Sequence, residues 1–118
     1  MDILMILNGN PYDGSDKTWN ALRLANTLLQ KECKVCIFLM NDSVDLARDK
    51  TVKPDYYDTD LVAMLKELIS KGLVLKVCGT CQARCGIHKN EPYFSPDVKS
   101  TMNELAELII NSGKVITF

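Results

Sequence analysis

The sequence lacks the features that mark membrane, secreted and nucleic-acid-binding proteins. It has no run of about 18 apolar residues, so no membrane-spanning helix is expected. Its first residues contain neither a basic segment nor a small-residue cleavage site, so we expect no secretory signal peptide. The 14 basic residues are balanced by 15 acidic ones and form no cluster, which argues against nucleic-acid binding. These absences favour a cytoplasmic protein.

Phosphate-binding motifs are absent as well. Segment 8–14 contains glycines but neither G-x-G-x-x-G nor Gly-Lys-Ser/Thr, so nucleotide binding is not supported. Cysteine, by contrast, is plentiful, with five in 118 residues. A chain of this length buries enough apolar surface to fold without disulfides or a metal. In a reducing compartment, cysteines are more often reactive thiols or metal ligands than bridges. We therefore expect thiol chemistry that needs no organic cofactor.

Apolar segments of the chain are expected to form strands that alternate with amphipathic helices. The strands are predicted at residues 2–7, 34–40, 73–77 and 114–118. Three longer helices are predicted from apolar stripes at helical spacing, over residues 21–29, 61–69 and 98–109. Ser95 is the expected N-cap of the last helix, with Pro96 at its first position. This alternation predicts one α/β domain over residues 1–118, with a mostly parallel sheet of four to five strands covered on both faces.

The cysteines divide into two groups by their place relative to the predicted strands. Sites in open α/β sheets form at the carboxyl ends of strands. Cys33 precedes the second strand and Cys36 lies inside it, so both are expected to be structural. Cys78, Cys81 and Cys85 follow the third strand, at the edge where sites form. They are the candidate functional thiols.

The segment after the third strand has the local chemistry of a reactive thiol site. Gly79 permits a tight turn directly after Cys78. A short helix is expected to begin near Thr80 or Cys81, and unpaired N–H groups at a helix start favour a thiolate. Arg84 adds a nearby cation. We therefore predict catalytic roles for Cys78, Cys81 and Arg84.

The loop after the first strand is expected to share this edge of the sheet. Parallel strands bring residues 8–16, residues 41–43 and the cysteine segment to one side. We therefore expect Asn8 and Tyr12 to line the thiol pocket together with Gly79 and Thr80. Ordinary turn chemistry explains the opening loop equally well.

Three chemistries remain open for these thiols. In the first, one thiolate receives a sulfane sulfur and passes it on. In the second, Cys78 and Cys81 form the C-x-x-C pair of a dithiol–disulfide exchanger. In the third, the chain is a zinc-binding or redox-sensing module, in which Cys81, Cys85 and His88 lie on one face of a helix and Cys78 completes the four ligands.

Several strings of the sequence resemble the DsrE/DsrF-like family of small sulfur-handling proteins, particularly its YchN-like and TusD-like members. They are Asn8-Gly9-Asn10-Pro11-Tyr12, the helix segment 19–25, and the strand 35–40 with Asn41-Asp42. The most specific is Val77-Cys78-Gly79-Thr80-Cys81-Gln82-Ala83-Arg84. The resemblance covers the chain from its first strand to its last.

The resemblance implies a three-layer α/β/α fold and a homo-oligomer, commonly a trimer or hexamer. It also implies that Cys78 occupies the place of the cysteine that carries a persulfide in sulfur-relay members. Such members act as sulfurtransferases or relay subunits with donor and acceptor proteins. In this sequence Cys85 interrupts the family's Arg-Gly pair, between Arg84 and Gly86. The resemblance therefore leaves the role of Cys85 open.

Overall fold

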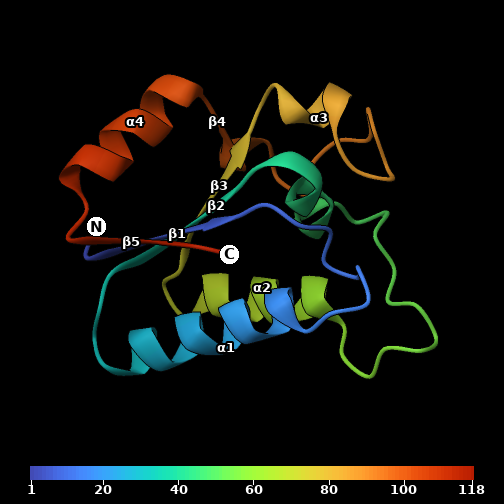
Figure 1. Ribbon diagram of the computed structural model, residues 1–118, viewed down its shortest axis with the longest axis horizontal. Coiled ribbons are helices and arrows are strands. Elements are labelled where there is room, and N and C mark those ends of the chain that lie inside the picture. Colours follow the sequence, from blue (N-terminus) through green and yellow to red (C-terminus); the bar gives the residue numbers. More distant parts are fainter.

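Short apolar segments assemble into a central sheet with helices on both sides, as the computed structural model of residues 1–118 shows (Figure 1). The elements in chain order are β1 (Ile3–Leu7), α1 (Lys17–Gln30), β2 (Val35–Leu39), the 3₁₀ helix η1 (Asn41–Ala47), α2 (Leu61–Ser70), β3 (Val74–Cys78), α3 (Cys81–Arg84), the 3₁₀ turn η2 (Pro96–Val98), β4 (Lys99–Ser100), α4 (Met102–Asn111) and β5 (Lys114–Thr117).

All strand pairs in the sheet are parallel, and the strand order is β4-β3-β2-β1-β5. Helices α1 and α2 cover one face, while α3 and α4 lie on the other (Figure 1). The predicted α/β class with a parallel sheet is therefore confirmed. No helix is long and apolar enough to cross a membrane, and the longest, α1, has 14 residues.

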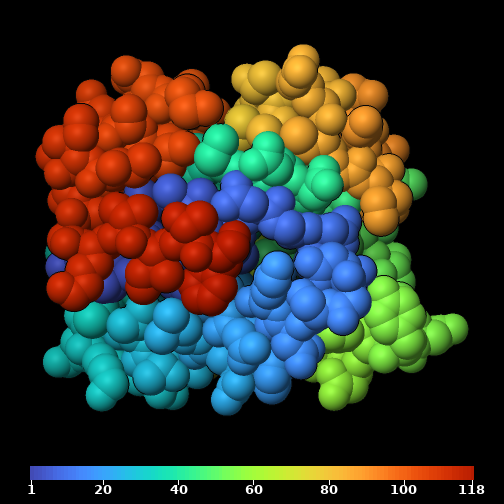
Figure 2. Space-filling model, viewed as in Figure 1, coloured from blue at the N-terminus to red at the C-terminus, as the bar shows by residue number.

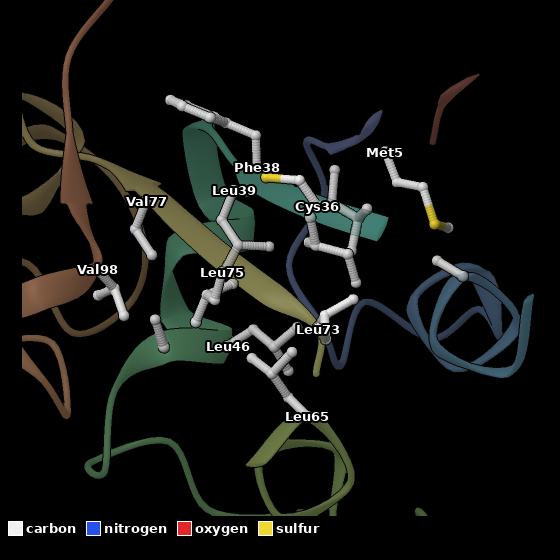
Figure 3. Close-up of a cluster of buried hydrophobic side chains, with 14 of the residues drawn as sticks. Met5, Cys36, Phe38, Leu39, Leu46, Leu65, Leu73, Leu75, Val77 and Val98 are labelled. Carbon is white, nitrogen blue, oxygen red and sulfur yellow. The ribbon is translucent and has the colours of Figure 1, made fainter. Parts of the chain in front are cut away.

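Strand β2 lies at the centre of the core. All five of its residues are buried, because helices or loops cover both faces of the sheet at this point. Side chains alternate between the faces, so Leu39 points to the side of Leu46 and Leu65 whereas Phe38 points to the opposite side (Figure 3). Cys36 lies among these apolar side chains as a small buried residue, as its position inside a strand predicted.

The last long helix begins later than the sequence predicted. Ser95 does act as a cap, accepting a hydrogen bond from the Asp97 N–H at 3.4 Å, but only for the short turn η2. The chain then pairs with β3, so Ser100 lies opposite Cys78 in the sheet. Thr101 is the N-cap of α4 and accepts a hydrogen bond from the Glu104 N–H at 3.1 Å. Pairing with β3 therefore overrides the helical pattern and brings residues 99–101 beside the cysteines.

Candidate functional site: a cavity with three cysteines

The candidate thiol site is built where β3 ends. Its last residue is Cys78, and α3 begins three residues later at Cys81. Between them, the Gly79 N–H donates to the Ser100 carbonyl at 3.0 Å. A Cβ at position 79 would lie 3.0 Å from the same oxygen, which is tighter than ordinary packing. Glycine therefore lets the chain turn closely against β4 directly after the first thiol.

The sulfur of Cys78 faces the first residue of α3. The Cys81 N–H donates to Cys78 Sγ at 3.4 Å, and both cysteines are only 8% exposed. A backbone N–H directed at sulfur stabilises negative charge there. The sulfur of Cys78 is thus held against the start of α3.

The three cysteines of the segment share one cavity of about 280 Å³. Its lining consists of Met40, Asn41, Cys78, Gly79, Thr80, Cys81, Arg84, Cys85, Ser100, Thr101 and Met102. In the space-filling view, a notch separates the gold segment that carries the cysteines from the orange surface of α4, with teal residues of the β2–η1 region at its base (Figure 2). Five residues expected at the site, Cys78, Gly79, Thr80, Cys81 and Arg84, therefore do lie together.

Burial lowers the reactivity of the Cys81 thiol. Burial raises its pKa well above the usual range, and the neighbouring thiol of Cys78 raises it further. Cys81 consequently stays protonated near neutral pH, whereas a nucleophilic cysteine must react as the thiolate. The sequence could not rank Cys78 and Cys81, and the raised pKa argues against Cys81 as the first nucleophile.

Alkylation by iodoacetamide should report this difference. Because only the thiolate reacts, we expect the labelling rate of Cys81 to rise about tenfold per pH unit from pH 7 through pH 9 without a plateau. Peptide mapping by mass spectrometry gives the rate at each cysteine. Half-buried Cys33, at the opposite edge of the sheet, is the internal reference. A plateau for Cys81 near pH 8 to 9 would contradict the raised pKa.

Neither predicted residue of the opening loop lines the cysteine cavity. The Asn8 side chain accepts a hydrogen bond from Asn41 Nδ2 at 3.0 Å. Asn8 therefore contacts Asn41, which lines the cavity, but does not line the cavity itself. The Tyr12 hydroxyl accepts the Leu61 N–H at 2.9 Å and lines a different pocket. The reason is the strand order: β2 lies between β1 and β3, and this separates the loops that follow them.

The four residues considered for zinc do not converge. His88 lines the second pocket with Tyr12, and no group of three or more His, Cys, Asp or Glu side chains is arranged to hold a metal. The physical cause is that α3 ends at Arg84 and Cys85 is extended, with φ −130°. Gly86 then adopts φ +89° and turns the chain away. Helical spacing between Cys81 and His88 is therefore lost.

The two remaining cysteines lie outside the site. Cys36 is fully enclosed in the core, and burial raises its pKa to about 11. Cys33 lies just before β2, at the edge opposite the cavity, and is half-buried. Both placements agree with the structural role predicted from the sequence.

A buried arginine, which no sequence pattern marked, holds the cysteine segment in place. Arg48 follows η1, is fully buried, and pairs with Asp45 at 2.8 Å. Its guanidinium also donates to the carbonyls of Gln82 at 2.6 Å and Cys85 at 3.0 Å. A third donor, Nε, reaches the Glu91 carbonyl at 3.2 Å. Arg48 therefore fixes the backbone on both sides of the exposed turn after α3.

Tyr93 holds the start of the cysteine segment, at Cys78. The centre of its ring lies 5.3 Å from the Arg48 guanidinium carbon, and its hydroxyl donates to the Cys78 carbonyl at 2.8 Å.

Four further residues line the cavity but were not predicted as site residues: Met40, Ser100, Thr101 and Met102. The last three were assigned to a helix that begins later than expected.

Comparison with known proteins gives consistent matches over the whole chain. A family model described as the DsrE/DsrF-like family matches residues 1–118. An uncharacterized protein of Methanocaldococcus jannaschii is 32% identical, with all of both chains covered. A second uncharacterized protein, from Methanopyrus kandleri, is 32% identical over 98% of this chain and 93% of its own length. The crystal structure of the YchN protein from E. coli matches with a TM-score of 0.82 and 30% identity, covering 100% of this chain and 99% of that one.

Proposed function

Because the chain belongs to the DsrE/DsrF-like family, we propose that it carries sulfane sulfur as a persulfide on Cys78. The observation that carries the proposal is the position of Cys78 Sγ, which lines a cavity and accepts the Cys81 N–H at 3.4 Å. The same N–H can stabilise the charge that a persulfide bears. The protein would then act as a sulfurtransferase or as a subunit of a sulfur relay.

The transfer itself needs only the Cys78 thiolate and a donor persulfide. The thiolate attacks the outer sulfur of R–S–SH, the sulfur–sulfur bond of the donor breaks, and R–S⁻ leaves. The products are Cys78–S–SH and, after protonation, R–SH. Arg84 lies exposed on the cavity wall and makes no ion pair, so its charge is available to attract an anionic donor.

We propose further that the chain forms a homo-oligomer, a trimer or hexamer, and exchanges sulfur with donor and acceptor proteins. Helix α4 supports this proposal because it leaves Ile110 79% exposed, and Met102 at the mouth of the cavity is 64% exposed. An acceptor protein that docks at this mouth would bring its thiol to the persulfide. Light scattering of the purified chain reports the oligomeric state.

The proposal is tested by incubating the reduced protein with inorganic polysulfide and mapping the cysteines by mass spectrometry. We expect the Cys78 peptide to gain one sulfur atom, about 32 Da, before any other peptide does. Cys78→Ser should abolish this gain, whereas Cys33→Ser at the opposite edge should leave it unchanged. Unmodified Cys78 with several classes of donor, or equal labelling of Cys33, would rule out a carrier role.

A further inference from the structure

We infer that Cys81 resolves the persulfide on Cys78, releasing the carried sulfur as sulfide and closing a Cys78–Cys81 disulfide. This activity rests on the proposed function and extends it, because a carrier with a resolving thiol also reduces sulfane sulfur. The substrate class is then a persulfide or polysulfide, and the product is hydrogen sulfide. An external dithiol is needed to reopen the disulfide for another cycle.

The geometry of the pair supports a disulfide. Cys78 ends a strand and Cys81 begins a helix, which is the arrangement of C-x-x-C redox pairs. The 3.4 Å contact between the Cys81 N–H and Cys78 Sγ places the sulfur against the backbone of its partner. Both cysteines also line the same cavity. Gly79 leaves no side chain at the turn between them.

Position gives Cys81 an advantage over any acceptor from outside. Both thiols are only 8% exposed, so an external thiol must enter the cavity before it reaches the persulfide. Cys81 is already there, and a group held next to its target reacts as if present at very high concentration. Half-buried Cys85 lines the same cavity.

The resolving step balances without an added oxidant. The Cys81 thiolate attacks the inner sulfur, which belongs to Cys78, and its proton goes to solvent. The bond between the inner and outer sulfur breaks, and the outer sulfur leaves with the electron pair as HS⁻. The sulfane sulfur is reduced by two electrons, and the two cysteine sulfurs are oxidised together to the disulfide.

Protonation of Cys81 controls how fast the sulfur is discharged. Burial and the neighbouring Cys78 sulfur raise the pKa of Cys81, so its thiolate is scarce at neutral pH and becomes more abundant as the pH rises. The other ionisable groups around Cys78 and Cys81 are Cys85, Tyr93, Arg48 and Arg84. Discharge should therefore be slow at pH 7, leaving time for transfer to an acceptor, and should accelerate steeply toward pH 9.

The test follows a protein loaded once with polysulfide, desalted, and kept without oxygen or reductant. In the wild type we expect loss of the Cys78 persulfide, release of about one equivalent of sulfide, and a disulfide that links Cys78 to Cys81. The rate should rise about tenfold between pH 7 and pH 8. Cys81→Ser and Cys81→Ala should keep the persulfide at least about tenfold longer. Cys33→Ser, at the opposite edge of the sheet, is the control and should behave as the wild type.

Each outcome of this experiment has a distinct meaning. If the Cys81 variants load but lose sulfur as fast as the wild type, or if the disulfide links Cys78 to Cys85, the resolving role is overturned while the carrier proposal stands. If no variant that retains Cys78 acquires sulfur there, the carrier proposal fails, and the resolving role with it. Using both Ser and Ala at position 81 separates loss of the thiol from a local folding defect.

Discussion

Replacing Arg48 with alanine is expected to lower the free energy of unfolding by about 3–5 kcal/mol, because it leaves a buried carboxylate without its cation. The side chains of Arg48 and Asp45 are 0% and 1% exposed. Asp45 would then keep its charge with almost no exposure to solvent. Since domains of this size are stable by only about 5–15 kcal/mol, the variant should be close to unfolding at ambient temperature.

The loss extends beyond the ion pair to the cysteine segment. Without Arg48, the carbonyls of Gln82, Cys85 and Glu91 lose their side-chain donor. The Gln82 carbonyl keeps the Asn90 N–H at 2.9 Å, whereas a buried acceptor left without any donor costs about 1–3 kcal/mol. Arg48→Lys should recover only part of the stability, because one ammonium cannot reproduce the forked contacts of a guanidinium.

Denaturation in urea, followed by circular dichroism, measures this effect. Lys66→Ala is the matched control, since Lys66 pairs with Asp49 at 2.7 Å on the surface, with side chains 49% and 68% exposed. Breaking that exposed pair should cost less than about 1 kcal/mol. If Arg48→Ala loses no more than this control, then Arg48 does not hold the segment.

The fold and the position of Cys78 could be predicted because their signals are local. Apolar runs and helical stripes mark the strands and helices within windows of about ten residues. The rule that sites form at the carboxyl ends of parallel strands then separated Cys78 and Cys81 from Cys36. The turn at Gly79 and the helix start at Cys81 follow from the same short string of residues.

The support of the site was not predictable in the same way. Arg48 contacts carbonyls that lie 34 to 43 residues away in the sequence, and no local pattern marks such partners. The order of strands was also hidden, so Tyr12 was expected at the cysteines although β2 intervenes. At Ser95 the local capping signal was correct, but pairing with β3 delayed the helix.

Gly86→Ala is the second substitution with a large expected effect, a loss of about 2–5 kcal/mol in the free energy of unfolding. Gly86 has φ +89°, a left-handed conformation that a side chain disfavours. A Cβ there would also lie 2.7 Å from Arg48 Nη1 and closer still to Asp45 Oδ1. Because that pair is buried and held by several hydrogen bonds, it cannot move aside at low cost.

Gly14→Ala separates the two causes of this loss. Gly14 has the same φ of +89°, but a Cβ there would meet nothing within 4 Å. Gly14→Ala should therefore cost only the backbone strain, about 1 kcal/mol, and the difference between the two variants measures the overlap with the ion pair. Equal losses, measured by urea denaturation, would show that the pair yields easily.

The steric overlap in Gly86→Ala should also change the reactivity of the nearby Cys85. The Gly86 N–H donates to Asp42 Oδ1 at 3.0 Å, and the residue directly follows Cys85, whose carbonyl is bound by Arg48. A side chain at position 86 would displace the Arg48 guanidinium and weaken its hydrogen bond to the Cys85 carbonyl. In Gly86→Ala we therefore expect iodoacetamide to label Cys85 several-fold faster than in Gly14→Ala, under conditions where circular dichroism shows both variants folded. Unchanged labelling of Cys85 would mean that the Asp45–Arg48 pair stabilises the fold without positioning the thiols.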